Sequence, residues 1–283
     1  MYFQDRIVPS DDLHLDIKDR GFLLGDGLFE TIHSFSGSIP YLLMHWDRLN
    51  AGLSVLDIPR FLSFELLETA VEQVLKANKL ERAEATLRLT VTRGAGPRGL
   101  LPPESPSPRL FLTACPYQAP KKEAFSAIIA SIRRNEYSPL SRIKSLCYLD
   151  NVLAKQEAFK SSKDEALLLN SKGKIVGASA ANVFFLKGGK LFTSDINEGT
   201  LAGVTRQIII EVAQKIDLAI VFEAIEIRDL PFVQEAFLSN SLLGVMPLVE
   251  IDGLKIGDGE AGDLTMYLKK KYDLRSTEYP IHM

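Results

Sequence analysis

The chain has 283 residues, 46% of them hydrophobic and 24% charged, a composition that is ordinary for a folded globular protein. Its formal net charge of −3 gives no electrostatic reason to expect nucleic acid or an anionic membrane as a partner. Cys115 and Cys147 lie far apart, which predicts neither a disulfide framework nor a metal site. Without a signal pattern or a long apolar run, the sequence predicts a soluble, cytoplasmic protein.

The first part of the chain predicts mixed strands and helices. Glycines in the segment 21–27 predict a tight turn that leads into a strand, in which Leu28, Glu30 and Ile32 share one face. After a turn at 36–38, we expect the chain to return as a strand through residues 39–43. Further along, the pattern predicts helices at 45–56 and 64–77 and strands at 85–93 and 109–114.

A loop rich in glycine and proline at 93–103 precedes the expected strand at 109–114. Loops of this length more often have a function than serve only as connections. Prolines also mark a linker at 116–120. We therefore expect an N-terminal α/β sub-domain at 1–115 and a C-terminal sub-domain at 121–283, in a mixed α/β (α+β) fold.

The C-terminal part repeats the mixture of strands and helices. Its patterns predict strands at 125–132, 165–169 and 183–186, a strand and turn at 236–248, and a short strand at 249–251. They also predict helices after Lys144, at about 204–216 and at 261–270.

Lys144 stands just before a stretch with helical spacing, in which Leu149, Val152, Leu153 and Phe159 predict an apolar face packed on a core. A lysine at a helix N-terminus experiences the positive end of the helix dipole. This position favours the neutral amine that a Schiff-base lysine needs. Taken alone, however, Lys144 is more often a solvated surface residue than a nucleophile.

Three segments could hold an anion. Residues 199–206 place a turn of small residues before a helix. The free amides at the start of this helix either bind a phosphate or are simply capped by a neighbouring group. The polar run Ser239, Asn240 and Ser241 interrupts an apolar strand. Arg48 fits either a phosphate clamp or an ordinary solvated charge.

Together these segments resemble the fold-type IV pyridoxal-phosphate enzymes, which include branched-chain aminotransferases, D-amino acid aminotransferases and aminodeoxychorismate lyases. The matching runs are GDGLFE at 25–30, HWDRL at 45–49, IKSL at 143–146 with NVLA at 151–154, and LAGVTR at 201–206. The run SNSLLGVMP at 239–247 is most similar to the aminodeoxychorismate lyases.

The resemblance implies pyridoxal 5′-phosphate as cofactor, no metal, and a homodimer. It also implies a role for each matched residue. These are Lys144 as the catalytic Schiff-base lysine; Arg48, Val204, Thr205, Ser239, Asn240, Ser241, Gly177 and Ala178 around the cofactor; and Phe29 and Arg98 toward the substrate. Arg98 falls where D-amino acid aminotransferases keep an arginine for the substrate carboxylate, but Leu100 departs from their accompanying histidine.

The largest departure from the family concerns the cofactor ring. Relatives carry a glutamate five residues before the asparagine that corresponds to Asn182, and its carboxylate keeps the pyridine nitrogen protonated. This chain has Gly177 there, and the stretch 171–185 contains no acid. The ring should then be a weaker electron sink, which disfavours fast transamination.

Three hypotheses follow. The first is a lyase of folate biosynthesis that eliminates pyruvate from 4-amino-4-deoxychorismate and leaves 4-aminobenzoate, a step that aromatisation drives. The second is an aminotransferase acting on D- or branched-chain amino acids. The third is a degenerate binding or scaffold relative, which Gly177 alone supports.

Overall fold

The computed structural model describes residues 1–278, which form two compact units. The first contains Met1–Gln118 and Ile143–Cys147, and the second contains Ala119–Arg142 and Tyr148–Arg275. The main boundary thus falls within the proline-rich stretch that suggested a linker. The sequence division placed Ile143–Cys147 in the C-terminal sub-domain, whereas this short segment, which carries Lys144, packs with the first unit.

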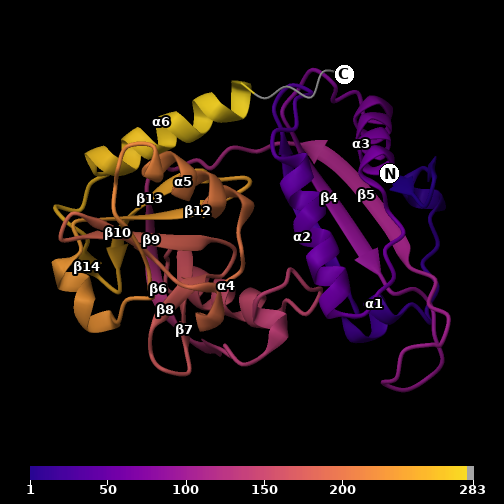
Figure 1. Cartoon of the computed structure of the whole chain (residues 1–283), viewed down its shortest axis with the longest axis horizontal. Helices are drawn as coiled ribbons and strands as arrows, with labels where there is room; N and C mark the ends of the chain where they lie inside the picture. The colour runs from indigo at the N-terminus through magenta and orange to yellow at the C-terminus, as the bar shows by residue number, and fades with distance from the viewer. Residues whose placement is uncertain (279–283) are drawn as a thin grey trace. The chain divides into compact units, whose positions relative to one another are not determined.

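The first unit is built on a five-stranded antiparallel sheet in the order β2-β1-β5-β4-β3. In Figure 1, the helices α2 and α3 run along this sheet. The elements of this unit are β1 (Tyr2–Phe3), β2 (Arg6–Ile7), η1 (Ser10–Asp12), α1 (Arg20–Leu24), β3 (Gly27–Ser34), α2 (Leu42–Val55), α3 (Phe64–Ala77), β4 (Ala85–Thr92) and β5 (Arg109–Pro116).

Alternation along the strands explains the first core. Leu28 and Ile32 on β3 and Leu87 and Leu89 on β4 are buried against apolar residues of α2 and α3. The expected return strand at 39–43 is wrong, because α2 already begins at Leu42.

The second unit is built on a nine-stranded mixed sheet in the order β11-β10-β9-β12-β13-β6-β7-β8, with β14 paired to β13. Its strands are β6 (Phe125–Arg134), β7 (Glu165–Asn170), β8 (Ile175–Ala178), β9 (Asn182–Lys187), β10 (Lys190–Thr193), β11 (Ile220–Phe222), β12 (Glu235–Asn240), β13 (Gly244–Ile251) and β14 (Leu254–Lys255). Its helices are η2 (Pro139–Ser141), α4 (Leu149–Lys160), η3 (Ile196–Glu198), α5 (Val204–Gln214), η4 (Ile227–Phe232) and α6 (Asp263–Glu278).

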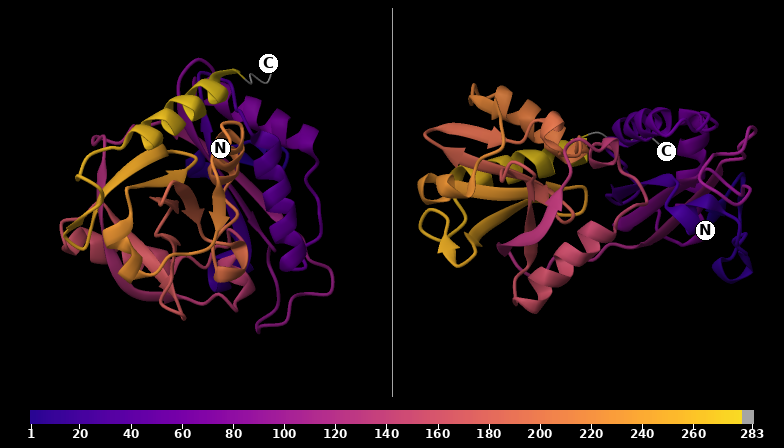
Figure 2. Two further views of the ribbon diagram at one scale, coloured as in Figure 1. Left: turned by 60° about the vertical axis from the view of Figure 1, so that its left-hand side comes forward. Right: turned by 90° about the horizontal axis from the view of Figure 1, so that it is seen from below.

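This sheet curls round its core, as Figure 2 shows. Although β8 stands at one end of the strand order, the amide of Ala178 donates to the carbonyl oxygen of Ala181 at 2.8 Å and so holds β8 beside the start of β9. The curl brings together polar ends of strands that are distant in the strand order.

Helix α4 packs differently from the prediction. Its buried face is made of Asn151, Ala154 and Ala158, while the apolar residues Leu149 and Phe159 are 76% and 82% exposed. The two alanines pack against a small cluster with Ala130, Ala166 and Leu168. Small side chains let the helix lie close to β6 and β7, so the larger apolar stripe faces outward.

Within residues 1–278, no helix has both the length and the apolar character that crossing a bilayer requires.

Candidate active site

The first unit places Lys144 on the edge of its sheet. The amide of Phe29 donates to the Lys144 carbonyl oxygen at 2.9 Å, and the amide of Leu146 donates to the Gly27 carbonyl oxygen at 3.0 Å. The lysine segment therefore adds to β3 as a short extra strand. Helix α4 begins only at Leu149, and a helix dipole acts mainly within its first turn. The expected activation of Lys144 by that helix is therefore wrong, and β3 determines its surroundings.

The side chain of Lys144 lies over an aromatic ring. Its Nζ atom is 4.4 Å from the ring centroid of Phe29, and Arg88 Cζ is 3.4 Å from the same centroid. Phe29 is buried at 4% exposure, so its ring is a fixed support. Aromatic faces attract cations, which orients the Lys144 amine along this ring.

A buried cluster of charged groups lies between β3 and α2. Glu30 is 1% exposed and accepts hydrogen bonds from Arg48 through Nε at 2.8 Å and through Nη2. His45 Nδ1 lies 2.7 Å from Glu30 Oε2. This fork geometry fixes the guanidinium of Arg48, the residue predicted to bind phosphate.

The electrostatics of this cluster are strongly coupled. Burial raises the pKa of Glu30, but the charge of Arg48 and the hydrogen bonds from His45 and Arg48 outweigh that effect and lower the pKa to about 2. Burial lowers the pKa of His45 more than Glu30 raises it, and Arg48 and Lys144 lower it further. The cluster thus holds an ionised carboxylate, a guanidinium and a neutral imidazole near pH 7.

Arg98 lies exposed on the long loop after β4. The buried guanidinium of Arg20 fixes this loop by donating to the carbonyl oxygens of Gly99, Leu100 and Leu101, at 3.1, 2.8 and 3.2 Å. The loop therefore has a defined shape, and Arg98 projects from it toward solvent.

In the second unit, the start of α5 forms an anion-binding arrangement. The helix begins at Val204 after Gly203, and no side chain among the described residues caps its first amides. A Cβ atom on Gly203 would lie 2.0 Å from Asn182 Oδ1, so the backbone passes the Asn182 side chain too closely for any other residue. Uncapped amides and the helix dipole favour a phosphate here.

Ser239 supplies a second sign of a ligand at the same place. It pairs directly with Asn182 across β12 and β9, so the two side chains share one face of the sheet. The Ser239 Oγ atom is buried, and among residues 1–278 it has no hydrogen-bond partner. A buried hydroxyl without a partner is costly. A phosphate oxygen held at the start of α5 would satisfy it, so these residues fit the phosphate of the expected cofactor.

The other predicted residues of this unit have structural partners. Asn240 donates to the Ala180 carbonyl oxygen at 3.0 Å and accepts from the amides of Leu242 and Leu243, so its side chain shapes the turn that carries Ser241. Thr205 is buried with its Oγ1 atom 3.5 Å from the Tyr272 hydroxyl. Gly177 and Ala178 are buried in β8.

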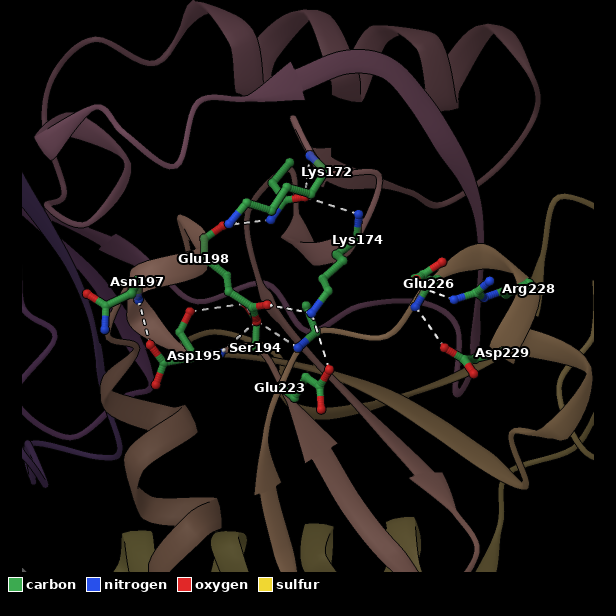
Figure 3. Close-up of polar contacts among 12 residues, drawn as sticks. Lys172, Lys174, Ser194, Asp195, Asn197, Glu198, Glu223, Glu226, Arg228 and Asp229 are labelled. Atoms are coloured by element: carbon green, nitrogen blue, oxygen red, sulfur yellow. Dashed lines mark hydrogen bonds and ion pairs between the residues drawn. The ribbon is translucent and has the colours of Figure 1, made fainter.

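The sequence analysis missed a network that supports the turn before α5. Figure 3 shows Glu198 accepting hydrogen bonds from Lys174 at 3.1 Å and from the amide of Asp195 at 3.3 Å. It also accepts from the amide of Ala224 at 2.7 Å, while Lys174 pairs with Glu223 at 3.2 Å. Glu198 immediately precedes the turn 199–203, so this network fixes the base of the phosphate arrangement.

Comparison with known proteins agrees with this geometry. Residues 27–251 match the family model described as amino-transferase class IV. A protein of Methanocaldococcus jannaschii, provisionally assigned as a branched-chain-amino-acid aminotransferase, is 35% identical over 281 residues, which cover 98% of this chain and 96% of that protein. The aminodeoxychorismate lyase of Bacillus subtilis is 31% identical over 278 residues, 96% of this chain and 94% of that enzyme.

A solved structure shows the same fold. The branched-chain amino acid aminotransferase of Thermobaculum terrenum, in its holo form with pyridoxal phosphate, superimposes with a TM-score of 0.88 at 24% identity, over 98% of this chain and 93% of that one. The cofactor of this family is pyridoxal 5′-phosphate, whose phosphate suits the arrangement at α5. This chain belongs to the class IV aminotransferases, the fold-type IV family that also includes the aminodeoxychorismate lyases.

Proposed function

We propose that this chain is a pyridoxal-phosphate-dependent lyase that converts 4-amino-4-deoxychorismate to 4-aminobenzoate and pyruvate in folate biosynthesis in the cytoplasm. The observation that carries the proposal is Gly177, because the chain lacks the carboxylate that relatives keep at this position and that fast transamination needs. Elimination of pyruvate creates an aromatic ring, so it depends less on a strongly electron-withdrawing cofactor ring than transamination does. The serine-rich run at 239–241 also favours the lyase.

Each residue then has a defined task. Bound cofactor supplies an aldehyde that joins an amine and a ring that withdraws electrons. Lys144 would hold the cofactor through that aldehyde, and its amine would move protons on the substrate. In the second unit, the amides of Val204 and Thr205 and the hydroxyls of Ser239 and Ser241 bind the phosphate. Arg48 of the first unit carries the phosphate-binding role that the family resemblance implies. Phe29 supports the lysine, and Arg98 binds a substrate carboxylate.

The first experiment tests cofactor binding. Pyridoxal phosphate is added to the purified protein, its absorbance spectrum is recorded, and the complex is reduced with borohydride and digested. We expect a visible band and a single labelled peptide that contains Lys144, and no label in the Lys144→Met variant. Absence of the band, or label spread over surface lysines such as Lys155, would favour the scaffold hypothesis.

The second experiment tests the reaction. We expect release of 4-aminobenzoate from 4-amino-4-deoxychorismate without any added 2-oxo acid. A cofactor-loaded sample that releases none would exclude the lyase.

An aminotransferase acting on branched-chain or D-amino acids is the second candidate. It is favoured by the 35% identity to the M. jannaschii protein and by Arg98, which falls where the resemblance implies an arginine for the substrate carboxylate. Transfer of an amino group to a 2-oxo acid, with turnover that requires both substrates, would establish it.

We further propose that the protein acts as a homodimer. Leu149, Val152, Leu153 and Phe159 form an exposed apolar stripe on α4. Contiguous apolar patches of this kind commonly mark protein interfaces, and a second copy of this chain is the partner that the family resemblance implies.

A further inference from the structure

The position of Gly177 has room for a side chain but carries none. Gly177 lies in β8 opposite Leu168, and its surroundings are buried. A Cβ atom built on it would meet the Ala181 carbonyl oxygen at 3.4 Å and Thr200 Oγ1 at 3.9 Å, both ordinary contacts. The structure thus has space for a Cβ atom here, and Thr200 Oγ1 is the side-chain atom nearest to it.

The Thr200 hydroxyl is held in one orientation. Thr200 is 4% exposed, and its Oγ1 atom accepts a hydrogen bond from Asn182 Nδ2 at 3.1 Å. Asn182 Nδ2 also donates to the Leu201 carbonyl oxygen at 2.9 Å, which fixes the amide. A hydroxyl that accepts from an amide keeps its own proton for a further acceptor. Within residues 1–278, Asn182 is the partner that the structure records for this hydroxyl.

The backbone around Thr200 is rigid for the same reason that the phosphate arrangement is rigid. Thr200 follows Gly199, which ends η3 with a φ of +94°. The Glu198 network holds η3 in place. The oxygens of a glutamate lie three bonds beyond its Cβ, and Thr200 Oγ1 lies 3.9 Å from the Cβ position of residue 177, which is about that reach.

We propose that the Thr200 hydroxyl donates a hydrogen bond to the pyridine nitrogen of pyridoxal phosphate and leaves that nitrogen unprotonated. A carboxylate beside the nitrogen would stabilise the pyridinium cation by its charge, whereas a neutral hydroxyl only shares its proton with the nitrogen lone pair. The ring keeps its position but loses much of its electron-withdrawing power. The inference rests on the proposed cofactor binding and explains why this chain suits an elimination that aromatisation drives.

The test measures the protonation and hydrogen bonding of the ring nitrogen by NMR. Apoprotein is loaded with pyridoxal phosphate labelled with ¹⁵N in the ring, and the ¹⁵N chemical shift of the bound cofactor is compared with those of free pyridine and pyridinium forms. We expect the wild-type signal in the range of an unprotonated, hydrogen-bonded nitrogen. Thr200→Ser should keep that signal, Thr200→Val should move it toward a nitrogen without a hydrogen bond, and Gly177→Glu should move it to the pyridinium range.

Two results would overturn the inference: a pyridinium signal in the wild type, or a Thr200→Val signal identical to that of the wild type. The first result needs only the wild type, and the second needs only Thr200→Val, which keeps the shape of residue 200. The inference therefore stays testable even if Gly177→Glu fails to fold. A protein that binds no cofactor shows no bound signal at all, and that outcome refutes the proposed function rather than the role of Thr200.

Discussion

At the scale of single residues, the buried carboxylate of Glu30 is held by two charged or polar partners. It is surrounded by Arg48 and His45, and removing one partner from such a cluster leaves the others buried and uncompensated. The residue therefore links the orientation of Arg48 to the stability of the first unit.

Replacing Glu30 with glutamine should lower the free energy of unfolding at pH 7 by about 3 kcal/mol. Because folding lowers the pKa of Glu30 from 4.5 to about 2, the carboxylate stabilises the fold above pH 4.5, and this stabilisation is lost as the pH falls toward 2. Urea unfolding of wild type and Glu30→Gln at pH 7 and pH 3 should therefore show a smaller difference at pH 3.

Glu84→Gln is the matched control. Glu84 lies 3.3 Å from His33 but its side chain is 51% exposed, so the loss should stay below ~1 kcal/mol. Equal losses for Glu30→Gln at both pH values would contradict the linkage.

The burial of Glu30 follows from the sequence alone. Alternation placed Glu30 on the same strand face as Leu28 and Ile32, and a carboxylate in an apolar row requires a buried partner. The role of Thr200 could not be predicted in this way, because its nearness to Gly177 depends on the curl of the second sheet and not on local sequence.

At the scale of elements, the sequence predicts helix α3 correctly and the buried face of helix α4 wrongly, for different physical reasons. Helix α3 was predicted with its observed bounds, Phe64–Ala77, since a strong apolar periodicity and a Ser63 cap act locally. The buried face of α4 was predicted wrongly, because its alanines carry little hydrophobic signal in the sequence yet allow the closest packing. The apolar residues of α4 are exposed instead.

The turn before α5 should not tolerate a side chain. Gly203→Ala would place a Cβ atom 2.0 Å from Asn182 Oδ1, so either the turn or Asn182 must move. We expect affinity for pyridoxal phosphate, measured by absorbance titration, to fall at least about tenfold. Gly189→Ala, in an open hairpin turn of the same unit, should leave affinity unchanged. Unaltered binding by Gly203→Ala would argue against phosphate at α5.

The Glu198 network predicts that weakening it will reduce the affinity for pyridoxal phosphate but not the affinity for pyridoxal. Lys174→Met removes the ion pairs to Glu198 and Glu223, which raise the pKa of Lys174, and should loosen the turn before α5. We expect binding of pyridoxal phosphate to weaken about fivefold, an effect of ~1 kcal/mol, while binding of pyridoxal, which lacks the phosphate, stays the same.

Lys187→Met removes the comparable pair to Asp229, outside this network, and serves as the control. A parallel loss for both ligands in Lys174→Met would indicate general destabilisation instead of a phosphate-specific role.

At the scale of the whole molecule, the exposed apolar stripe on α4 predicts the oligomeric state. Sedimentation at micromolar concentration should show a dimer for the wild type and a monomer for the double variant Leu149→Asp, Phe159→Asp, with unchanged circular dichroism. Lys190→Asp, which alters an exposed position of β10 away from this stripe, should remain dimeric. A monomeric wild type would refute the proposed dimer.

The short segment that carries Lys144 also has a consequence for the order of folding. Phe29 and Lys144 are far apart in the chain, yet their backbones are hydrogen-bonded, so closing this contact requires a long loop and carries a high entropic cost. During synthesis, β4, β5 and residues 119–142 of the second unit all emerge before Lys144, the neighbour of β3. The reactive amine thus joins the sheet of the first unit only after every strand of that sheet has been made.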